Sequence, residues 1–186
     1  MLSFKRLALL AACLPVLGAA YGQQLVRFPK GKIDFKSDAP QEVIKASSDA
    51  LTGIIDPGRN TFLFKVPVSS FNGFNSALQK VHFNENYMES VKYPDAVFSG
   101  KIVETIDYQA DGVYDVRAKG KLKVHGIEFE RIIKAQMTIK KDKVKITSAF
   151  SVLLSDHNIP IPKVVNEKLA NEIWVTMEAQ GMLTDK

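Results

Sequence analysis

Apolar and polar residues alternate with a period of two along much of this chain. The clearest case is the segment 114–124, where one set of alternating positions is apolar or small and the other set is charged. The first set is Tyr114, Val116, Ala118, Gly120, Leu122 and Val124, and the second is Asp115, Arg117, Lys119, Lys121 and Lys123. Because successive side chains of a strand point to opposite faces of a sheet, this pattern predicts a strand with one buried and one solvated face.

The same alternation recurs in further segments separated by short turns. Residues 127–139 follow a turn at His125-Gly126, which predicts a hairpin with the segment 114–124. The other alternating segments are 61–68, 96–102, 144–152 and 173–179, and the weaker examples are 25–36 and 42–56. The pattern therefore predicts about eight strands.

Two segments depart from the period of two. Residues 76–90 begin with the Ser76-x-x-Gln79 form of a capping box, and apolar residues then follow at helical spacing, so we expect a short helix there. Residues 157–163 contain two prolines one residue apart, which excludes a central strand and predicts an extended loop.

The one-sided strands constrain the fold class. Each apolar face must be buried against another layer, and one short helix cannot cover about eight strands, so the sheet must close on itself or pack as a sandwich. Closure also removes exposed edges, and an eight-stranded barrel is just wide enough to be filled by side chains or to hold one small ligand. We expect a single all-β domain, an eight-stranded antiparallel barrel with one short helical insertion at about 76–90.

The N-terminus has the three-part layout of a secretory signal. Two cations at positions 5–6 precede the apolar run 7–14, and Ala20 and Gly22 offer small side chains at the −3 and −1 positions of a cleavage site. The apolar run is too short to span a bilayer as a permanent helix. We expect residues 1–22 to be a signal peptide. The domain 23–186 would then be periplasmic or secreted, without stable membrane insertion.

Cys13 provides an alternative for this N-terminal segment. Residues 10–13 match the spacing of a lipobox, which would lead to lipidation of Cys13. The apolar run before it is short and continues past the cysteine, so ordinary cleavage is favoured. Cys13 is the only cysteine, and its removal would leave no disulfide, no cysteine nucleophile and no thiolate metal ligand.

Charge and motifs give no indication of nucleic-acid binding or catalysis. The formal net charge is +5, and the lysines are spread along the chain rather than clustered. The chain has no G-x-S-x-G, G-x-G-x-x-G or P-loop motif. His82, His125 and His157 fall in separate predicted elements without a partner at metal-ligand spacing. We therefore expect a protein that is not an enzyme, with no catalytic residues, no metal and no cofactor.

Arg131 and Glu104 are charged residues on otherwise apolar registers. Arg131 shares the register of the apolar positions in 127–139, and Glu104 continues the register of Phe98 and Ile102. A guanidinium on a buried face needs a carboxylate or an anionic ligand to offset its desolvation. Two interpretations follow. Each residue lies near a barrel opening or is turned outward by a bulge, or Arg131 contacts the head group of a ligand.

Five motifs, taken together, resemble those of a known family. They are Leu51-Thr52-Gly53-Ile54-Ile55-Asp56, Phe64-Lys65-Val66-Pro67-Val68-Ser69-Ser70-Phe71, His82-Phe83-Asn84-Glu85-Asn86-Tyr87-Met88, the segment 92–100 (KYPDAVFSG) and the segment 120–126 (GKLKVHG). In this order the motifs resemble the YceI-like family of lipocalin-like, lipid-binding proteins, and the similarity spans residues 30 to 183.

The resemblance implies a barrel that encloses a long tunnel for an isoprenoid amphiphile, such as a polyprenyl phosphate or an isoprenoid quinone, carried in the periplasm. The inner positions that would line this tunnel are Phe62, Phe64, Val66, Phe98, Ile102, Tyr114, Val116, Phe129, Ile133, Met137, Phe150 and Val152. The expected partner is an apolar or amphiphilic lipid, and a homodimer stays open beside a monomer.

The same large side chains fit a second function class equally well. If they fill the barrel as a solid core, the protein is a non-enzymatic interaction module that acts through its surface, including the loop 155–163. A lipid that copurifies with the protein would select the carrier over this module.

The N-terminal pattern gives a first testable prediction. We expect the exported protein to begin at Gln23, because Ala20 and Gly22 form the best pair of small residues after the apolar run. N-terminal sequencing of periplasmic material measures this start directly. Recovery of the chain in a membrane fraction with a diacylated Cys13 would contradict both the cleavage site and the expected location.

Overall fold

The structure is a computed structural model, and it describes residues 24–184. The predicted signal peptide 1–22, the predicted start at Gln23 and the alternative lipidation at Cys13 lie outside the described residues. Within them, the chain forms the all-β fold that the alternation predicts.

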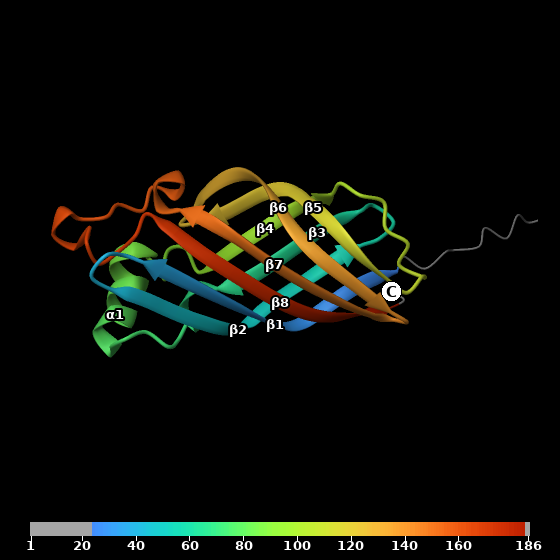
Figure 1. Cartoon of the computed structure of the whole chain (residues 1–186), viewed down its shortest axis with the longest axis horizontal. Helices are drawn as coiled ribbons and strands as arrows, with labels where there is room; N and C mark the ends of the chain where they lie inside the picture. The colour runs from blue at the N-terminus through green and yellow to red at the C-terminus, as the bar shows by residue number, and fades with distance from the viewer. Residues whose placement is uncertain (1–23, 185–186) are drawn as a thin grey trace, which may run out of the picture.

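Eight antiparallel strands close into one barrel (Figure 1). They are β1 (Leu25–Asp38), β2 (Val43–Asp56), β3 (Thr61–Pro67), β4 (Asp95–Ile102), β5 (Gly112–Val124), β6 (Ile127–Lys140), β7 (Lys143–Leu153) and β8 (Glu172–Thr184). Each strand pairs with the next along the chain, and β8 pairs with β1 to complete the ring. The expected eight-stranded antiparallel barrel is confirmed.

The β5–β6 hairpin shows how the pattern produces the strands. Val116 and Leu122 on β5 are buried, whereas Lys119 on the other face is exposed. The two-residue turn has positive φ at both His125 (50°) and Gly126 (76°), which is the backbone of a type I′ turn and matches the twist of the flanking strands. The hairpin is therefore specified locally, by alternation and by turn chemistry.

β1 and β2, in which apolar and polar residues alternate least clearly, are long strands. Each contains 14 residues. Their pairing register shifts on both sides of Gly31, between Phe28 and Gly31 and between Gly31 and Ile33. A β-bulge of this kind adds a residue to one strand and interrupts the alternation, which is why the pattern was weak here.

The predicted helix lies between β3 and β4, at one end of the barrel (Figure 1). It consists of α1 (Ala77–His82) followed by a π-helical turn, η2 (Phe83–Tyr87). The Ser76 hydroxyl accepts a hydrogen bond from the Gln79 amide at 3.2 Å, as the capping box predicts. The segment after β7 contains no strand. It holds two short 3-10 turns, η3 (Leu154–His157) and η4 (Lys163–Val165).

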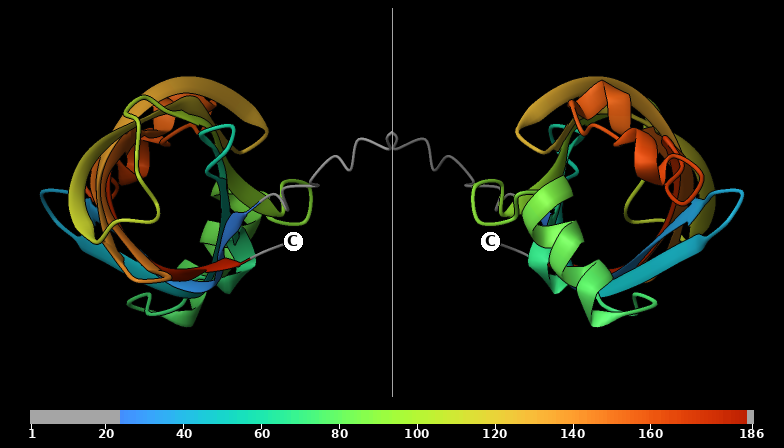
Figure 2. Two further views of the ribbon diagram at one scale, coloured as in Figure 1. Left: turned by 90° about the vertical axis from the view of Figure 1, so that its right-hand side faces the viewer. Right: turned by 90° about the vertical axis from the view of Figure 1, so that its left-hand side faces the viewer.

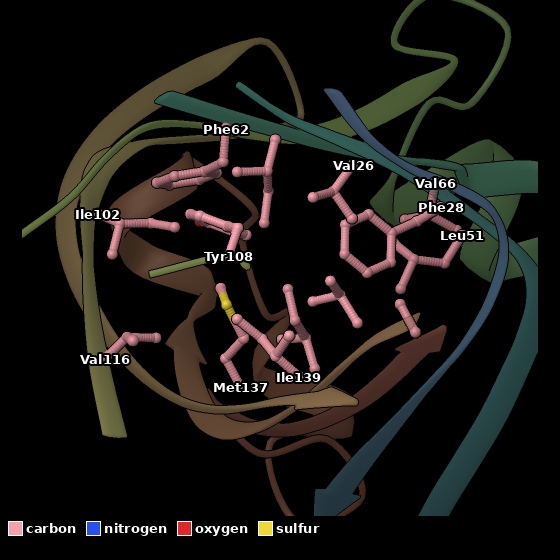
Figure 3. Close-up of a cluster of buried hydrophobic side chains, with 14 of the residues drawn as sticks. Val26, Phe28, Leu51, Phe62, Val66, Ile102, Tyr108, Val116, Met137 and Ile139 are labelled. Carbon is pink, nitrogen blue, oxygen red and sulfur yellow. The ribbon is translucent and has the colours of Figure 1, made fainter. Parts of the chain in front are cut away.

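Apolar side chains fill the end of the barrel opposite α1. Val26, Phe28, Ile139 and Val144 are all buried there. They belong to a larger cluster that extends along the inside of the barrel, and Figure 3 shows inward-pointing members of it from several strands. Tyr108, in the β4–β5 connection, belongs to the same cluster. Burial raises the pKa of its phenol to about 12. This end, which we call the far end, is closed by packing.

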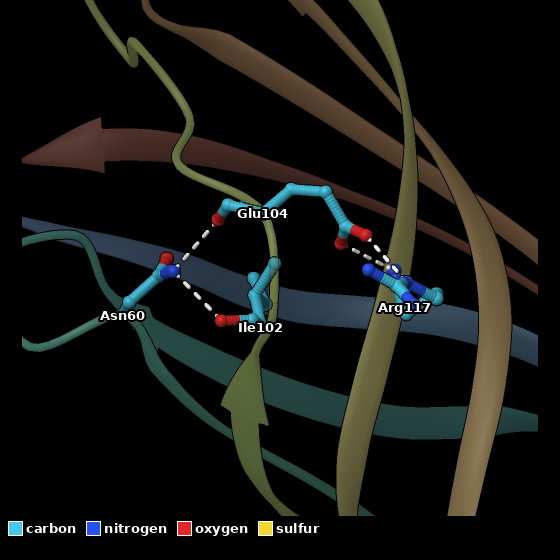
Figure 4. Close-up of polar contacts among 4 residues, drawn as sticks. All are labelled: Asn60, Ile102, Glu104 and Arg117. Carbon is cyan, nitrogen blue, oxygen red and sulfur yellow. Dashed lines mark hydrogen bonds and ion pairs between the residues drawn. The ribbon is translucent and has the colours of Figure 1, made fainter.

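Glu104 lies in the connection that leads to Tyr108, outside the barrel wall. β4 ends at Ile102, so Glu104 no longer follows the inner register. Its carboxylate accepts hydrogen bonds from the Arg117 backbone amide and from Arg117 Nε, each at 2.7 Å (Figure 4). Asn60 Nδ2 donates to the carbonyls of Ile102 and Glu104, at 2.8 Å each. The Arg117 hydrogen bonds hold the pKa of Glu104 below its usual value.

The register of β5 gives a stability prediction. Val116→Asp should lower the free energy of unfolding by about 3 kcal/mol or more, because it places an unpaired carboxylate in the buried core. The matched change Lys119→Asp, on the exposed face of the same strand, should stay within about 0.5 kcal/mol. Urea denaturation of both variants measures the difference, and equal losses would show that the two faces are assigned wrongly.

Candidate functional site

An apolar cavity of about 290 Å³ occupies the end of the barrel next to α1. The barrel strands supply its wall, with Val66, Leu122 and Phe150 among the residues that face it. α1 and η2 cover one side through Phe83 and neighbouring residues, and the segment after β7 covers another through residues such as Leu169. We call this space the main cavity.

A smaller cavity of about 100 Å³ lies deeper in the barrel. It shares five lining residues with the main cavity, which are Ile33, Val66, Ala96, Leu122 and Phe150. The two spaces are therefore neighbours, separated only by these side chains. Beyond the inner cavity lies the packed far end, so the hollow part of the barrel ends inside the molecule.

Ten of the twelve residues predicted to line a tunnel lie around these two cavities. Phe62, Phe64, Phe98, Ile102, Val116, Ile133 and Met137 line the inner cavity, Val66 and Phe150 line both, and Val152 lines the main cavity. Aromatic contacts narrow the inner cavity, since the Phe62 and Phe98 ring centroids lie 4.9 Å apart. The inner register thus points into the hollow part of the barrel.

Tyr114 and Phe129 line neither cavity, in contrast to the prediction. Tyr114 packs against the hydrophobic core instead. Phe129 is 41% exposed, and its ring lies 6.4 Å from that of His157 in an edge-to-face arrangement. Both residues follow the inner register of their strands, and their ladder partners, Leu122 for Phe129 and Met137 for Tyr114, do line the cavities. The register of a strand therefore does not by itself place a side chain at a cavity.

Arg131 also lies outside both cavities, at a gap in the strand pairing. β6 and β7 pair over only six residue pairs, which end at Ala135 and Ser148. Residues 127–134 and 149–153 are left unpaired with each other, and we call this gap the seam. The Arg131 guanidinium crosses it and donates from Nη2 to the Ser151 carbonyl at 2.7 Å. Arg131 thus hydrogen-bonds the barrel wall, and it lines neither cavity.

Four phenylalanines over the main cavity were missed by the sequence analysis. Phe35, Phe71, Phe74 and Phe83 all line the cavity, and the Phe83 centroid lies between 5.0 and 5.9 Å from those of the other three. Phe71 and Phe74 follow β3 in an irregular segment, where a period of two carries no information. The helical spacing of Phe83 was the one available signal. This cluster holds α1 and η2 against the barrel.

Polar side chains border the main cavity on the side of α1 and residues 166–170. Glu42 accepts hydrogen bonds from Gln79 Nε2 at 2.6 Å and from Asn75 Nδ2 at 3.1 Å. His82 and Lys168 line the cavity and are exposed, so the cavity reaches the surface at this side. We call this opening the mouth. An apolar interior with a polar rim at one end can hold an amphiphile with its tail inside and its head group outside.

Two histidines hold the segments near the mouth together. His157 is fully buried, and its Nδ1 lies 3.2 Å from the Ile127 carbonyl, across the seam. His125 Nδ1 lies 3.2 Å from the His157 carbonyl, and His125 Nε2 lies 2.6 Å from Glu89 Oε2. The contacts join the β5–β6 turn, η3 and the segment after η2. Burial lowers the pKa of His157, and its Nε2 has no partner among the described residues.

The described residues contain no group of three or more His, Cys, Asp or Glu side chains that could hold a metal ion. None of the helices between residues 24 and 184 is long and apolar enough to cross a membrane.

Comparisons with known proteins agree with this architecture. A family model described as a YceI-like domain matches residues 25–181. No curated protein sequence matches the chain.

Three solved structures share the fold at low sequence identity. A polyisoprenoid binding domain from Saccharophagus degradans, implicated in plant cell wall breakdown, superposes with a TM-score of 0.71 at 12% identity, covering 88% of this chain and 99% of that one. Burkholderia cenocepacia BcnA gives 0.66 at 13% identity, covering 81% and 95%. The Campylobacter jejuni YCEI protein gives 0.54 at 14% identity, covering 98% and 100%.

The buried histidine predicts a dependence of stability on pH. The folded state lowers the pKa of His157, so around and below pH ~6.5 the unfolded chain binds more protons than the folded one. Stability contributed by neutral His157 should therefore be present above pH ~6.5 and be lost as the pH falls below it. Asp156 favours the protonated form and Arg131 disfavours it, and neither reverses the direction.

Urea midpoints between pH 7.5 and pH 5 measure this effect. We expect the midpoint of the wild type to fall on acidification and that of His157→Gln to fall less. The exposed His82 supplies the control, since His82→Gln should keep the dependence of the wild type. If the urea midpoint of His157→Gln falls with pH as steeply as that of the wild type, groups other than His157 cause the acid sensitivity.

Proposed function

We propose that this chain, which belongs to the YceI-like family, binds the apolar chain of an isoprenoid amphiphile inside the barrel and holds the head group at the mouth. The observation that carries this proposal is the apolar main cavity, which opens at the mouth and ends inside the barrel. The ligand class is a polyprenyl phosphate or an isoprenoid quinone, and the protein acts as a carrier or sequestering protein without catalysis.

The physical basis of binding is desolvation of the ligand chain. Each CH₂ group removed from water contributes about 0.8 kcal/mol, so a few isoprene units provide substantial affinity without polar contacts. Pockets for small molecules typically enclose about 300–1,000 Å³ and are mostly apolar with few polar groups. At about 290 Å³ the main cavity lies at the lower bound of that range, and the inner cavity extends it only slightly. The barrel therefore suits a limited number of isoprene units.

Similarity to the Saccharophagus degradans domain supports this ligand class. That protein is described as binding a polyisoprenoid, and the two chains share the barrel fold. At 12% identity the lining residues cannot be transferred between them. For this chain the support comes from its own cavity lining, above all from the phenylalanines that surround both cavities.

The mouth offers groups for either kind of head group. His82 and Lys168 border the cavity and are exposed, and the Lys168 ammonium group favours a phosphate. The Gln79 amide, which hydrogen-bonds Glu42, lies at the same border and can contact a quinone oxygen. We propose that these rim residues, rather than Arg131, contact the head group, because Arg131 binds the Ser151 carbonyl.

We also propose that the protein acts in the periplasm or outside the cell, after removal of residues 1–22. The charged, apolar and small-residue parts of the N-terminus support this location.

A prenyl series of graded length tests the carrier function. We expect affinity to rise with chain length until the cavities are full and then to stop rising, because added groups remain in water. Tryptophan fluorescence or calorimetric titration with short prenyl alcohols, prenyl phosphates and quinones measures both length and head-group preference. If no member of the series binds at any chain length, the filled-barrel interaction module is left as the function.

Phe150 gives a variant that tests the same site. It lines both cavities, so Phe150→Trp should close the passage to the inner cavity and lower the affinity for the longest chains by about tenfold or more, with short chains little affected. Ile132→Trp, at an exposed position on β6, is the matched control and should bind like the wild type. An equal loss for all chain lengths in Phe150→Trp would place the ligand elsewhere.

A further inference from the structure

Large apolar side chains are exposed around the mouth. Leu78, on α1, is 60% exposed, and Val81 lies one turn further along the same helix and is also exposed. Val91, in the turn after η2, is 100% exposed, and Val164, in η4, is 89% exposed. Single exposed apolar residues are ordinary, but these four lie on the two segments that border one opening.

The two segments lie on either side of the barrel opening. Figure 1 shows α1 and the segment after β7 at the same end, and the right panel of Figure 2 shows them flanking the opening as it faces the viewer. α1 has different faces toward the cavity and toward solvent. Gln79 and His82 line the cavity, whereas Leu78 and Val81 are exposed and do not line it. The exposed apolar residues thus surround the cavity without being part of it.

We propose that the mouth docks on the surface of a phospholipid bilayer, with Leu78, Val81, Val91 and Val164 inserted among the lipids, and that the ligand passes between the bilayer and the cavity there. This inference rests on the proposed function, since it assigns the source of the ligand of that same cavity. Docking removes the cost of moving the apolar chain of the ligand through water, which grows with every exposed CH₂ group.

The arrangement favours a bilayer over a protein partner or a second copy of the chain. The apolar residues are divided between two segments on opposite sides of the mouth, so a folded partner that covered both would also seal the cavity. A bilayer covers both segments and still places the mouth against a fluid apolar phase. Lys163 and Lys168 flank Val164 in sequence, and lysine can keep its ammonium group at the lipid–water interface while its stem contacts lipid.

Charge determines what kind of bilayer is required. The segments 76–92 and 154–171 together contain Lys80, Lys92, Lys163 and Lys168, and also Glu85, Glu89, Asp156 and Glu167. Because these charges balance, attraction to anionic lipid contributes little. Docking should therefore depend on apolar insertion, occur on zwitterionic lipid and change little with salt.

Flotation with phosphatidylcholine vesicles, with and without phosphatidylglycerol, tests the inference. We expect the full-length wild type to float with both kinds of vesicle, and Val164→Asp and Leu78→Asp each to lower the partition coefficient by about tenfold. Val113→Asp is the matched control. Val113 is also an exposed valine (64%), but it lies near the start of β5 at the far end, so the change should have no effect. Residues 1–23 are identical in all four proteins, so any contribution from them cancels.

A second measurement separates this inference from the proposed function. Farnesol binding in vesicle-free solution should be the same within about twofold in the wild type and all three variants, because no substituted residue lines a cavity. Farnesol binding without wild-type flotation, or equal flotation of Val164→Asp and Val113→Asp, would overturn docking and leave the cavity function intact. If the wild type forms dimers but does not float, and Val164→Asp abolishes the dimers, contact between two copies of the chain replaces docking as the role of these residues. If farnesol does not bind, the proposed function fails, and docking as a route for its ligand fails with it.

Discussion

Closure of the strand ladder defines the interior of this molecule. Because β8 pairs with β1, every inward side chain is enclosed, and the interior volume is set by strand number and tilt. What the interior can hold is then a matter of side-chain size at each height. Near Val26, Phe28 and Ile139 the side chains fill the bore, whereas next to α1 they leave the main cavity. One barrel thus contains both a packed core and a candidate binding site.

The ladder between β6 and β7 is incomplete beside the main cavity. Along the seam, backbone pairing between β6 and β7 is replaced by side-chain contacts from Arg131 to the Ser151 carbonyl and from His157 to the Ile127 carbonyl. Fewer backbone hydrogen bonds and more exposed segments mean a lower free energy of local opening. The gap in the β6–β7 ladder thus lies toward the end of the barrel that holds the main cavity, whereas the far end is closed by packing.

A single set of requirements explains the chemistry of the mouth. An amphiphile with its tail inside needs an apolar interior, a polar rim and a path that avoids exposing the tail to water. The phenylalanine cluster around Phe83 supplies the apolar interior, and Glu42, His82 and Lys168 form the polar rim. In our proposal the exposed apolar residues of α1 and η4 provide the path that keeps the tail out of water.

Alternation, turn residues and capping act within a few residues, so they predicted the strands, the hairpin turn, the capped helix and, outside β1 and β2, the face of each strand that points inward. Ten of the twelve residues predicted to line a tunnel do line at least one of the two cavities. The surroundings of Phe129 and Arg131 became clear only from the tertiary structure. Both residues share the inner register, but they lie at the seam. Alternation defines a face of a strand, but it does not show where two neighbouring strands stop pairing, and β6 and β7 stop at Ala135 and Ser148. Similarly, Phe71 and Phe74, outside any strand, could be placed over the cavity only by the packing of α1 and η2 against the barrel.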